Sequence, residues 1–348
     1  MTPLTMPARA DNDPILRPVP WRRMAWVTWR QHRVGLSGVA ALLAALTVYT
    51  WLTGRQLHHA YGVAMACHPA GSMACYELAR NFNNMGGFLA GGIPPQVVPA
   101  LIGAFVGAPV LARELETGTF RYAWTQGFDR WRWTLAKLVI LAVAVTAAAA
   151  AISLLFSWYY QPYFATANQR TSVTELAPLS PALFDLRGVD LAGWTLTAFA
   201  VGALTGLLLR RVVAAITATL VVYTGLAFAT GGLLRRHYLA PVVTRSLYLP
   251  RSAWILIQQW FNQGGRPVSA AVLSQVLQNG GGQLAGKGGV PQSISSWQYL
   301  VHHGYTQWTT YQPASRFWPF QWIEGGWLLA LSALCIAATV MLVRRRAI

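Results

Sequence analysis

The stretch from Arg113 to Lys137, R-E-L-E-T-G-T-F-R-Y-A-W-T-Q-G-F-D-R-W-R-W-T-L-A-K, lies between two long apolar segments. It holds three of the ten acidic residues of the chain and five basic ones. Elsewhere charge is scarce, because 54% of all residues are hydrophobic and only 11% are charged, against roughly a quarter charged in ordinary soluble domains. The composition therefore predicts an all-α membrane protein in which 113–137 is an aqueous loop between two transmembrane helices.

Six apolar segments have the length and low charge of transmembrane helices. We predict spans at 34–52, 86–112, 138–158, 191–209, 212–234 and 324–343, which together define a six-span membrane domain over 34–343. The fourth and fifth spans come from one apolar run that only Arg210 and Arg211 interrupt. Because an Arg at the bilayer centre costs roughly 2.5–3.5 kcal/mol, we expect these two residues in a turn at the membrane surface.

The distribution of basic residues predicts the orientation of the spans. Segments 1–33, 113–137, 210–211 and 344–348 hold 16 of the 27 Lys and Arg residues and would share one side of the membrane. The positive-inside rule places that side in the cytoplasm, which gives an N-in, C-in topology. The net charge of +17 is attributed to this topology and to contact with lipid, so nucleic acid is not an expected partner.

Three segments flank or interrupt the spans. Residues 1–20 are rich in charge and proline and are expected to form a disordered cytoplasmic tail. Residues 21–33 combine Trp and Arg, which suits an interfacial elbow helix; a plain basic flank of the first span is the alternative. Residues 235–321 are too long for a connector and are expected to form an extracellular helical domain, with helices near 252–263 and 270–277.

Two pairs of small residues have spacings with structural meaning. Gly103 and Gly107 form a G-x-x-x-G pair, which lets another helix approach closely; a hinge is the alternative role. Cys67 and Cys75 lie eight residues apart in a polar segment, where an oxidising environment favours a disulfide. Free thiols, and a metal site that includes His68, remain alternatives to the disulfide.

Motifs for chemistry within the chain are lacking. The segment Gly281–Lys287 is similar to a phosphate-binding loop, but Gly288 stands where a Ser or Thr would bind magnesium. By our boundaries no ionisable residue lies in the interior of a span, which argues against a proton- or sodium-coupled carrier. The acidic residues outside 113–137 are scattered along the sequence. We therefore predict no catalytic residue and no metal site.

The order R-E-x-E-x-G-T, followed by Arg130 and Lys137 before a new span, resembles ABC-2 type permeases, the membrane subunits of ATP-driven exporters. W-V-T-W-R-Q-H-R at 26–33 and A-W-T-Q-G at 123–127 resemble an actinobacterial branch of that family. The resemblance implies a type V-like exporter fold in which 113–137 docks on a separate ATPase subunit. The residues it assigns to this coupling are Arg113, Glu114, Glu116, Gly118, Thr119, Phe120, Trp124 and Arg130.

On this resemblance the chain is expected to be a permease subunit in the cell membrane, exporting an apolar or amphipathic compound. Its partners would be an ABC ATP-binding subunit and a second permease, as a homodimer or a heterodimer. The chain would bind no cofactor, because ATP and magnesium would belong to the ATPase subunit. The alternative hypothesis is a polytopic membrane enzyme, or a non-transporting sensor or regulator, with its site in 235–321.

Overall fold

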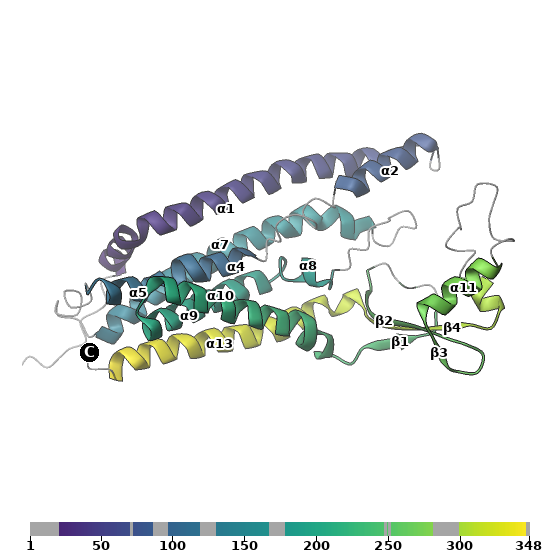
Figure 1. Cartoon of the computed structure of the whole chain (residues 1–348). Helices are drawn as coiled ribbons and strands as arrows, with labels where there is room; N and C mark the ends of the chain where they lie inside the picture. Colours follow the sequence, from purple (N-terminus) through teal and green to yellow (C-terminus); the bar gives the residue numbers. More distant parts are fainter. Residues whose placement is uncertain are drawn as a thin grey trace, which may run out of the picture.

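The computed structural model describes residues 21–69, 72–85, 97–118, 130–166, 178–246, 249, 252–280 and 299–345. In this part of the chain long helices form a bundle, and a small sheet with a helix beside it extends from one end (Figure 1). The C-terminus lies at the opposite end of the bundle (Figure 1). The predicted tail at 1–20 lies outside the described residues.

Within the residues that the structure describes, six helical segments are long and apolar enough to cross a membrane, which agrees with the six predicted spans. They are α1 (Trp21–Met65); α4 (Val97–Ile102), η1 (Gly103–Gly107) and α5 (Pro109–Glu116) in succession; α7 (Arg130–Thr166); α9 (Asp190–Leu209); α10 (Val212–Ala229) with η2 (Thr230–Leu234) and η3 (Arg235–His237); and η4 (Ala314–Arg316) with α13 (Phe317–Arg345). Two shorter helices, α2 (Met73–Met85) and α8 (Pro181–Phe184), connect spans. Arg210 and Arg211 form the turn between α9 and α10, as predicted.

The first helix differs from the prediction. α1 is a single helix of 45 residues, so 21–33 is its first part and not a separate elbow helix. Residues 53–65, which follow the first predicted span, are also helical, and α2 follows after a short turn. No proline occurs between 21 and 65, so the helix can continue into water, where polar side chains such as Arg55 and His59 cover its surface.

The helix α9 is the centre of the bundle. In its most apolar window 67% of residues are buried, against 6% in the window of α1. Gly103 and Gly107 of η1 lie against the α9 backbone, so a Cβ on Gly103 would come within 2.7 Å of the Ala198 carbonyl oxygen. In return Gly202 and Gly206 of α9 lie against the backbone of η1 and of the residue that follows it. We call these four residues the glycine contact; a side chain on any of them would separate the two helices.

The second span widens at its centre. η1 is one turn of π-helix, in which the Ala108 amide donates to the Gly103 carbonyl oxygen at 2.9 Å. Pro109 follows, and because proline has no amide hydrogen it cannot continue the usual pattern of hydrogen bonds. The turn accommodates one extra residue, and this sets the direction in which the side chains of α5 point.

The prediction that 235–321 is a helical domain is wrong in part. It contains a four-stranded antiparallel sheet with strand order β1-β4-β2-β3. The strands are β1 (Val242–Thr244), β2 (Trp254–Phe261), β3 (Pro267–Val268) and β4 (Thr306–Gln312), and α11 (Ala270–Gly280) matches the second predicted helix. The apolar residues of W-I-L-I-Q-Q-W-F fit a helical period, but its Ile and aromatic residues favour a strand that can pair with β4. Residues 281–298, which include the loop-like Gly281–Lys287, lie outside the described residues.

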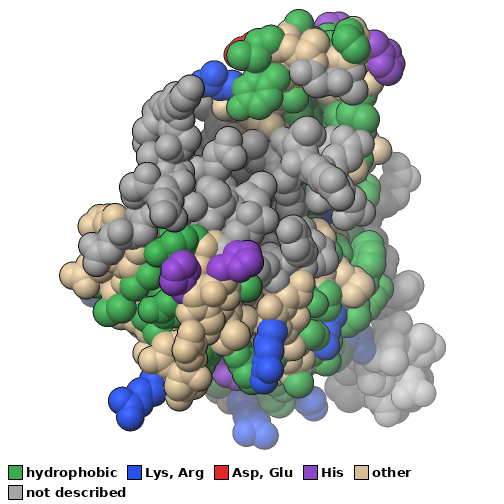
Figure 2. Space-filling view, turned by 90° about the vertical axis from the view of Figure 1, so that its right-hand side faces the viewer, with side chains coloured by type: hydrophobic (Ala, Val, Ile, Leu, Met, Phe, Trp, Pro, Cys, Tyr) green, Lys and Arg blue, Asp and Glu red, His purple; other side chains and the backbone are tan. Residues whose placement is uncertain are grey.

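The two ends of the bundle differ in charge. The arginine end, where α1 starts and α13 ends, exposes Arg30, Arg33, Arg113, Arg210, Arg211, Arg344 and Arg345. The opposite, sheet end faces the viewer in Figure 2, and acidic side chains are almost absent among its described surface atoms. The acidic residues Asp185, Asp190 and Glu324 nevertheless belong to the sheet end, and they are largely or wholly buried there.

Candidate functional sites at the two ends of the bundle

Five of the eight predicted coupling residues lie within the described part of the chain. Arg113, Glu114 and Glu116 lie in the last two turns of α5, and Gly118 follows the end of that helix. Arg130 is the first residue of α7. Thr119, Phe120 and Trp124 lie outside the described residues. What can be described is therefore how the two ends of the 113–137 segment are held in the bundle.

The first anchor is a buried lysine that sequence analysis did not place in the site. The side chain of Lys137 is 1% exposed, and its Nζ lies 2.6 Å from Glu114 Oε1. Nζ also donates to the Val110 carbonyl oxygen at 3.1 Å. Glu114 is itself 13% exposed, so it faces α7 and is not available to a partner protein. The pair joins α5 to α7, and removing either charge would leave its partner uncompensated.

The second anchor joins α5 to α10. Glu116 Oε2 accepts a hydrogen bond of 3.0 Å from the amide of Val212, the first residue of α10. Arg211, which precedes that helix, makes no side-chain cap of its own. The carboxylate of Glu116 therefore supplies the missing cap and lies at the positive end of the helix dipole. Both anchors come from the last turns of α5.

The end of α5 is shaped by Thr117 and Gly118. The amide and the hydroxyl of Thr117 both donate to the Arg113 carbonyl oxygen, at 3.0 and 2.8 Å. Gly118 then takes a left-handed conformation with φ of 70°, which L-amino acids with side chains rarely adopt. The chain therefore leaves the helix at Gly118.

The sheet end contains a site that sequence analysis missed. Four elements meet there: the turn after α8 supplies Asp185, α9 supplies Asp190, η3 supplies Arg235 and α13 supplies Glu324. One oxygen atom of each of the three carboxylates lies within 4.8 Å of the others. We call these four residues the carboxylate cluster. The three acidic residues are scattered along the sequence, and the fold brings them together.

Arg235 lies at the centre of the carboxylate cluster and is 1% exposed. Its Nε and Nη2 donate to the two oxygens of Glu324, at 3.0 and 2.7 Å. Nη2 also donates to Asp185 Oδ1, and the guanidinium carbon lies 4.4 Å from the centre of the Phe184 ring. This bidentate geometry is one that arginine makes and lysine cannot. It explains why a basic residue follows the fifth span on the side where few were expected.

Gln321 fixes the backbone beside the carboxylate cluster. Its Oε1 accepts from the amides of Val189 and Asp190, at 2.8 and 3.1 Å, and its Nε2 donates to the Phe184 carbonyl oxygen at 3.1 Å. One side chain of α13 thus satisfies three backbone groups around the start of α9. Asp190 is thereby held at the buried N-terminus of α9.

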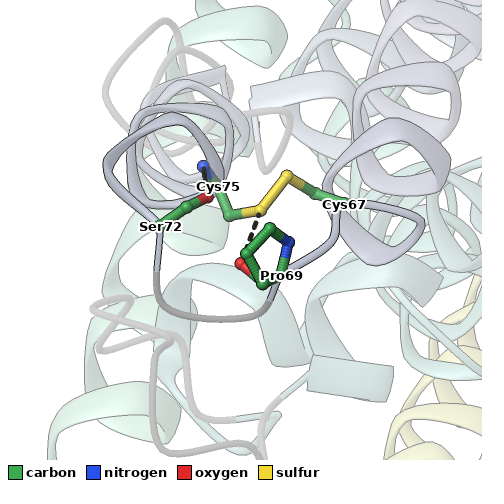
Figure 3. Close-up of a disulfide and its surroundings, with 4 residues drawn as sticks. All are labelled: Cys67, Pro69, Ser72 and Cys75. Carbon is green, nitrogen blue, oxygen red and sulfur yellow. Dashed lines mark hydrogen bonds between the residues drawn. A yellow bond between two sulfur atoms is a disulfide. The ribbon is translucent and has the colours of Figure 1, made fainter.

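A disulfide closes the turn between α1 and α2. Cys67 and Cys75 are bonded, with their Cα atoms 5.6 Å apart (Figure 3). The Ser72 hydroxyl accepts from the Cys75 amide at 3.3 Å within the same turn. The bond leaves neither sulfur as a thiolate, so the alternative metal site with His68 does not form in this structure. Cys335, in α13, is a buried free cysteine.

The fold defines a multi-pass membrane protein of six helical spans. A family model described as "ABC-2 membrane transporter related" matches residues 39–235, more than half of the chain. The chain therefore belongs to the ABC-2 membrane transporter related family. The matched range includes the second to fifth spans and the whole 113–137 segment. No curated protein and no solved structure matches the chain, and the resemblance to an actinobacterial branch stays a prediction.

Proposed function

We propose that the chain is the membrane subunit of an ABC exporter and that a separate ATP-binding subunit docks on its 113–137 segment. One observation carries this proposal: the end of α5 is joined to α7 through Lys137 and Glu114 and to α10 through Glu116. A flexible loop between two spans would need neither contact. A force applied to the end of α5 would reach three spans at once.

The glycine contact extends this path to α9. η1 and α9 touch backbone to backbone at Gly103, Gly107, Gly202 and Gly206, so neither helix can shift along the other without a matching movement. Movement of α5 would therefore displace α9, the most buried helix together with the second span. ATP-driven closure of the partner would in this way reorient the bundle.

Two observations support an arginine end that faces the cytoplasm. Its exposed arginines match the positive-inside rule. The Cys67–Cys75 disulfide lies in the turn after α1, toward the opposite end of the bundle (Figure 1), and disulfides persist in oxidising environments outside the cytoplasm. An ATP-binding partner would therefore meet 113–137 on the side where ATP is found.

A groove between α1 and α2 supports an amphipathic cargo. It has a volume of about 690 Å³, and apolar Leu78 and Met85 line it together with the polar Arg55 and His59. Apolar walls with one basic patch suit a molecule that has an apolar body and an anionic group. The barely buried α1 leaves room for a second permease copy, which would complete the wall of a transport path.

The enzyme alternative has little support in 235–321. That segment contains no Asp, Glu or Cys. Metal binding would then depend on histidines, and general acid–base chemistry on histidine, lysine and tyrosine. His302 and His303 are exposed on the surface. A sensor role without transport would still need a partner, and its distinguishing property would be the lack of ATP-driven cargo movement.

The proposal is tested by co-purification with photoreactive ATP. The tagged chain is extracted from its native membranes after mild cross-linking, and ATP-binding material is labelled with an azido-ATP analogue. We expect one labelled partner with the wild type, and at least a tenfold loss of label with Glu116→Lys. The matched control is Glu77→Lys, because Glu77 is exposed at the other end of the bundle in an ion pair with Arg80. Equal labelling of both variants, or ATP hydrolysis by the chain alone, would overturn the proposal.

A further inference from the structure

The carboxylate cluster is not balanced in charge. If all four groups were ionised, three carboxylates and one guanidinium would leave two net negative charges. Asp190, Glu324 and Arg235 are at most 1% exposed, and Asp185 is 22% exposed. Uncompensated charge in such a place is costly, so the cluster must bind a cation or a proton.

Glu324 is not the group that binds it. Its Oε1 accepts from Arg235 Nη2 and from Trp194 Nε1, at 2.7 and 3.0 Å. Its Oε2 accepts from Arg235 Nε and from the Tyr238 hydroxyl, at 3.0 and 3.2 Å. Four donors fill the four lone-pair positions of a carboxylate. The acceptor positions of Glu324 are therefore occupied, and a metal ion could not use it as a ligand without displacing a donor.

Asp190 is in the opposite situation. Its side chain is 0% exposed, and among the described residues neither of its oxygens accepts a hydrogen bond. The acidic groups within 4.8 Å are the carboxylates of Asp185 and Glu324, which would repel a second and third negative charge. An ionised Asp190 would be buried without a hydrogen-bond donor, whereas a protonated Asp190 has a hydroxyl that can donate a hydrogen bond to a neighbouring carboxylate.

The other charged and titratable groups around Asp190 do not alter this conclusion. Arg235 of η3 already pairs with Glu324 and Asp185. Tyr238 donates to Glu324, and Tyr223 of α10 packs edge-on against Trp194 of α9.

Arg187, in the turn before α9, lies over the rings of Phe164 and Phe317, at 4.0 and 5.1 Å from their centres. Among the described residues, the charges that face Asp190 are thus Asp185, Glu324 and Arg235, of which Arg235 alone is positive.

We propose that Asp190 is a proton-binding site, and that its bound proton lets the turn after α8, α9, η3 and α13 join at the sheet end. The hydroxyl of protonated Asp190 donates to Asp185, which in turn accepts from Arg235. The proton enters through Asp185, the one member of the cluster that is partly exposed. Loss of the proton would restore the second net charge and drive Asp185 outward into water.

The state of Asp185 supports this route. Burial raises the pKa of its carboxyl to about 6, against the opposing effect of Arg235 and with a further increase from Glu324. Asp185 can therefore take up and release protons near neutral pH, as a relay between solvent and Asp190 must do. The proton site lies at the sheet end, and its proton binding does not depend on an ATP-binding partner.

The test is infrared spectroscopy of the purified full chain in lipid nanodiscs, with carbon-13 in the aspartate side chains. A protonated carboxyl has a C=O stretching band separate from the carboxylate bands. At pH 7 we expect one such aspartate band in the wild type, its loss in Asp190→Asn, and its survival with a frequency shift in Asp185→Asn. Raising the pH from about 5 to about 10, well above the ordinary Asp pKa of about 3.9, should titrate the band away in the wild type.

Several outcomes would overturn the proposal. One is the absence of the band from the wild type at pH 7, and another is its persistence in Asp190→Asn. A third is its loss on adding Ca²⁺ or Mg²⁺, because Asp185 and Asp190 would then hold a metal ion instead of a proton. The wild-type titration does not require any variant to fold. Asp190→Asn resembles the protonated acid in shape, so at pH 7 we expect it to unfold at the same temperature as the wild type or higher.

Discussion

The two ends of the bundle bury charge in different ways. At the arginine end Lys137 and Glu114 form one pair of opposite charges, and a carbonyl oxygen is the only further partner of the ammonium group among the described residues. At the sheet end one guanidinium is shared by two carboxylates, and a third carboxylate has no donor among the described residues. The first site is electrically neutral as it stands, whereas the second carries two net negative charges when all its groups are ionised, and one bound proton reduces them to one.

This difference suggests a division of roles. A neutral buried pair holds two helices together under all conditions that keep both groups charged, which suits a segment that must pass on a force. An unbalanced cluster changes its net charge with its surroundings, which suits a contact that opens and closes. The predictions below test whether the two ends behave as separate units with these properties.

The largest effect is expected at the sheet end. Glu324→Gln would place an amide NH₂ group against Arg235, leave the buried guanidinium with Asp185 alone, and weaken the contacts of Trp194 and Tyr238. Breaking a buried ion pair costs about 3–5 kcal/mol. The free energy of unfolding, from denaturant titration in detergent, should fall by that amount. The control Glu77→Gln lies at an exposed ion pair and should change the free energy by less than about 0.5 kcal/mol.

The effect of Lys137→Met at the arginine end should be smaller. Glu114 is 13% exposed and can turn toward water. The free energy of unfolding should therefore fall by about 1–3 kcal/mol, the range for an unsatisfied buried polar group. The double variant Lys137→Met with Glu114→Gln removes both charges and should recover most of that loss. If the single and double variants are equally unstable, the pair is not the source of the effect. Both should retain the aspartate band proposed for the sheet end.

Gly202→Ala tests the glycine contact that lies between the two ends. A Cβ at this position would clash with the backbone of Gly103, Gly107 and Ala108, and overpacking of this kind costs about 1–3 kcal/mol. The control is Gly225→Ala, because no atom lies near the corresponding Cβ and alanine favours a helix by about 1 kcal/mol. Gly202→Ala should also weaken ATP-dependent cargo transport, and unchanged transport would contradict the proposed path through α9.

The smallest effect is a change in pH dependence. The pKa of Asp185 is raised in the folded protein to about 6, so its neutral form is favoured by folding. Its contribution to stability is complete below about pH 4, near its unfolded pKa, and is lost as the pH rises to about 6. The unfolding temperature of the wild type should therefore fall between about pH 4 and pH 6. This fall should be missing in Asp185→Asn and should persist in Lys137→Met. The same dependence of unfolding temperature on pH in the wild type and both variants would argue against titration of Asp185 at the sheet end.

The sequence allowed much of the bundle to be predicted and little of the sheet end. Runs without charge mark the six spans, because lipid excludes charged side chains irrespective of tertiary structure. Arg210 and Arg211 mark a turn for the same reason. The carboxylate cluster has no local pattern: Glu324 follows Asp190 by 134 positions, and only the packing of α13 against α9 brings them together.

Two errors have a common cause. The apolar residues of 254–261 are compatible with the period of a helix and with that of a strand. Pairing with β4, which is distant in sequence, makes this segment the strand β2. The first predicted span ends at 52 because hydropathy measures contact with lipid and not helix formation, whereas α1 continues to Met65. In both places the local sequence permitted two structures.

The π-turn at Gly103–Gly107 has a consequence for evolution and engineering of this helix. Each residue of an α-helix advances by about 100°, so one residue more or less in this turn would rotate all of α5 by nearly a third of a revolution. Glu114 would then point away from Lys137, and Glu116 away from the start of α10. Deleting the exposed Phe105 would leave the composition of the span almost unchanged, yet it would misalign the whole of α5 at the arginine end. The spacing between the glycine contact and the last two turns of α5 is thus a more demanding constraint than the identity of most side chains within it.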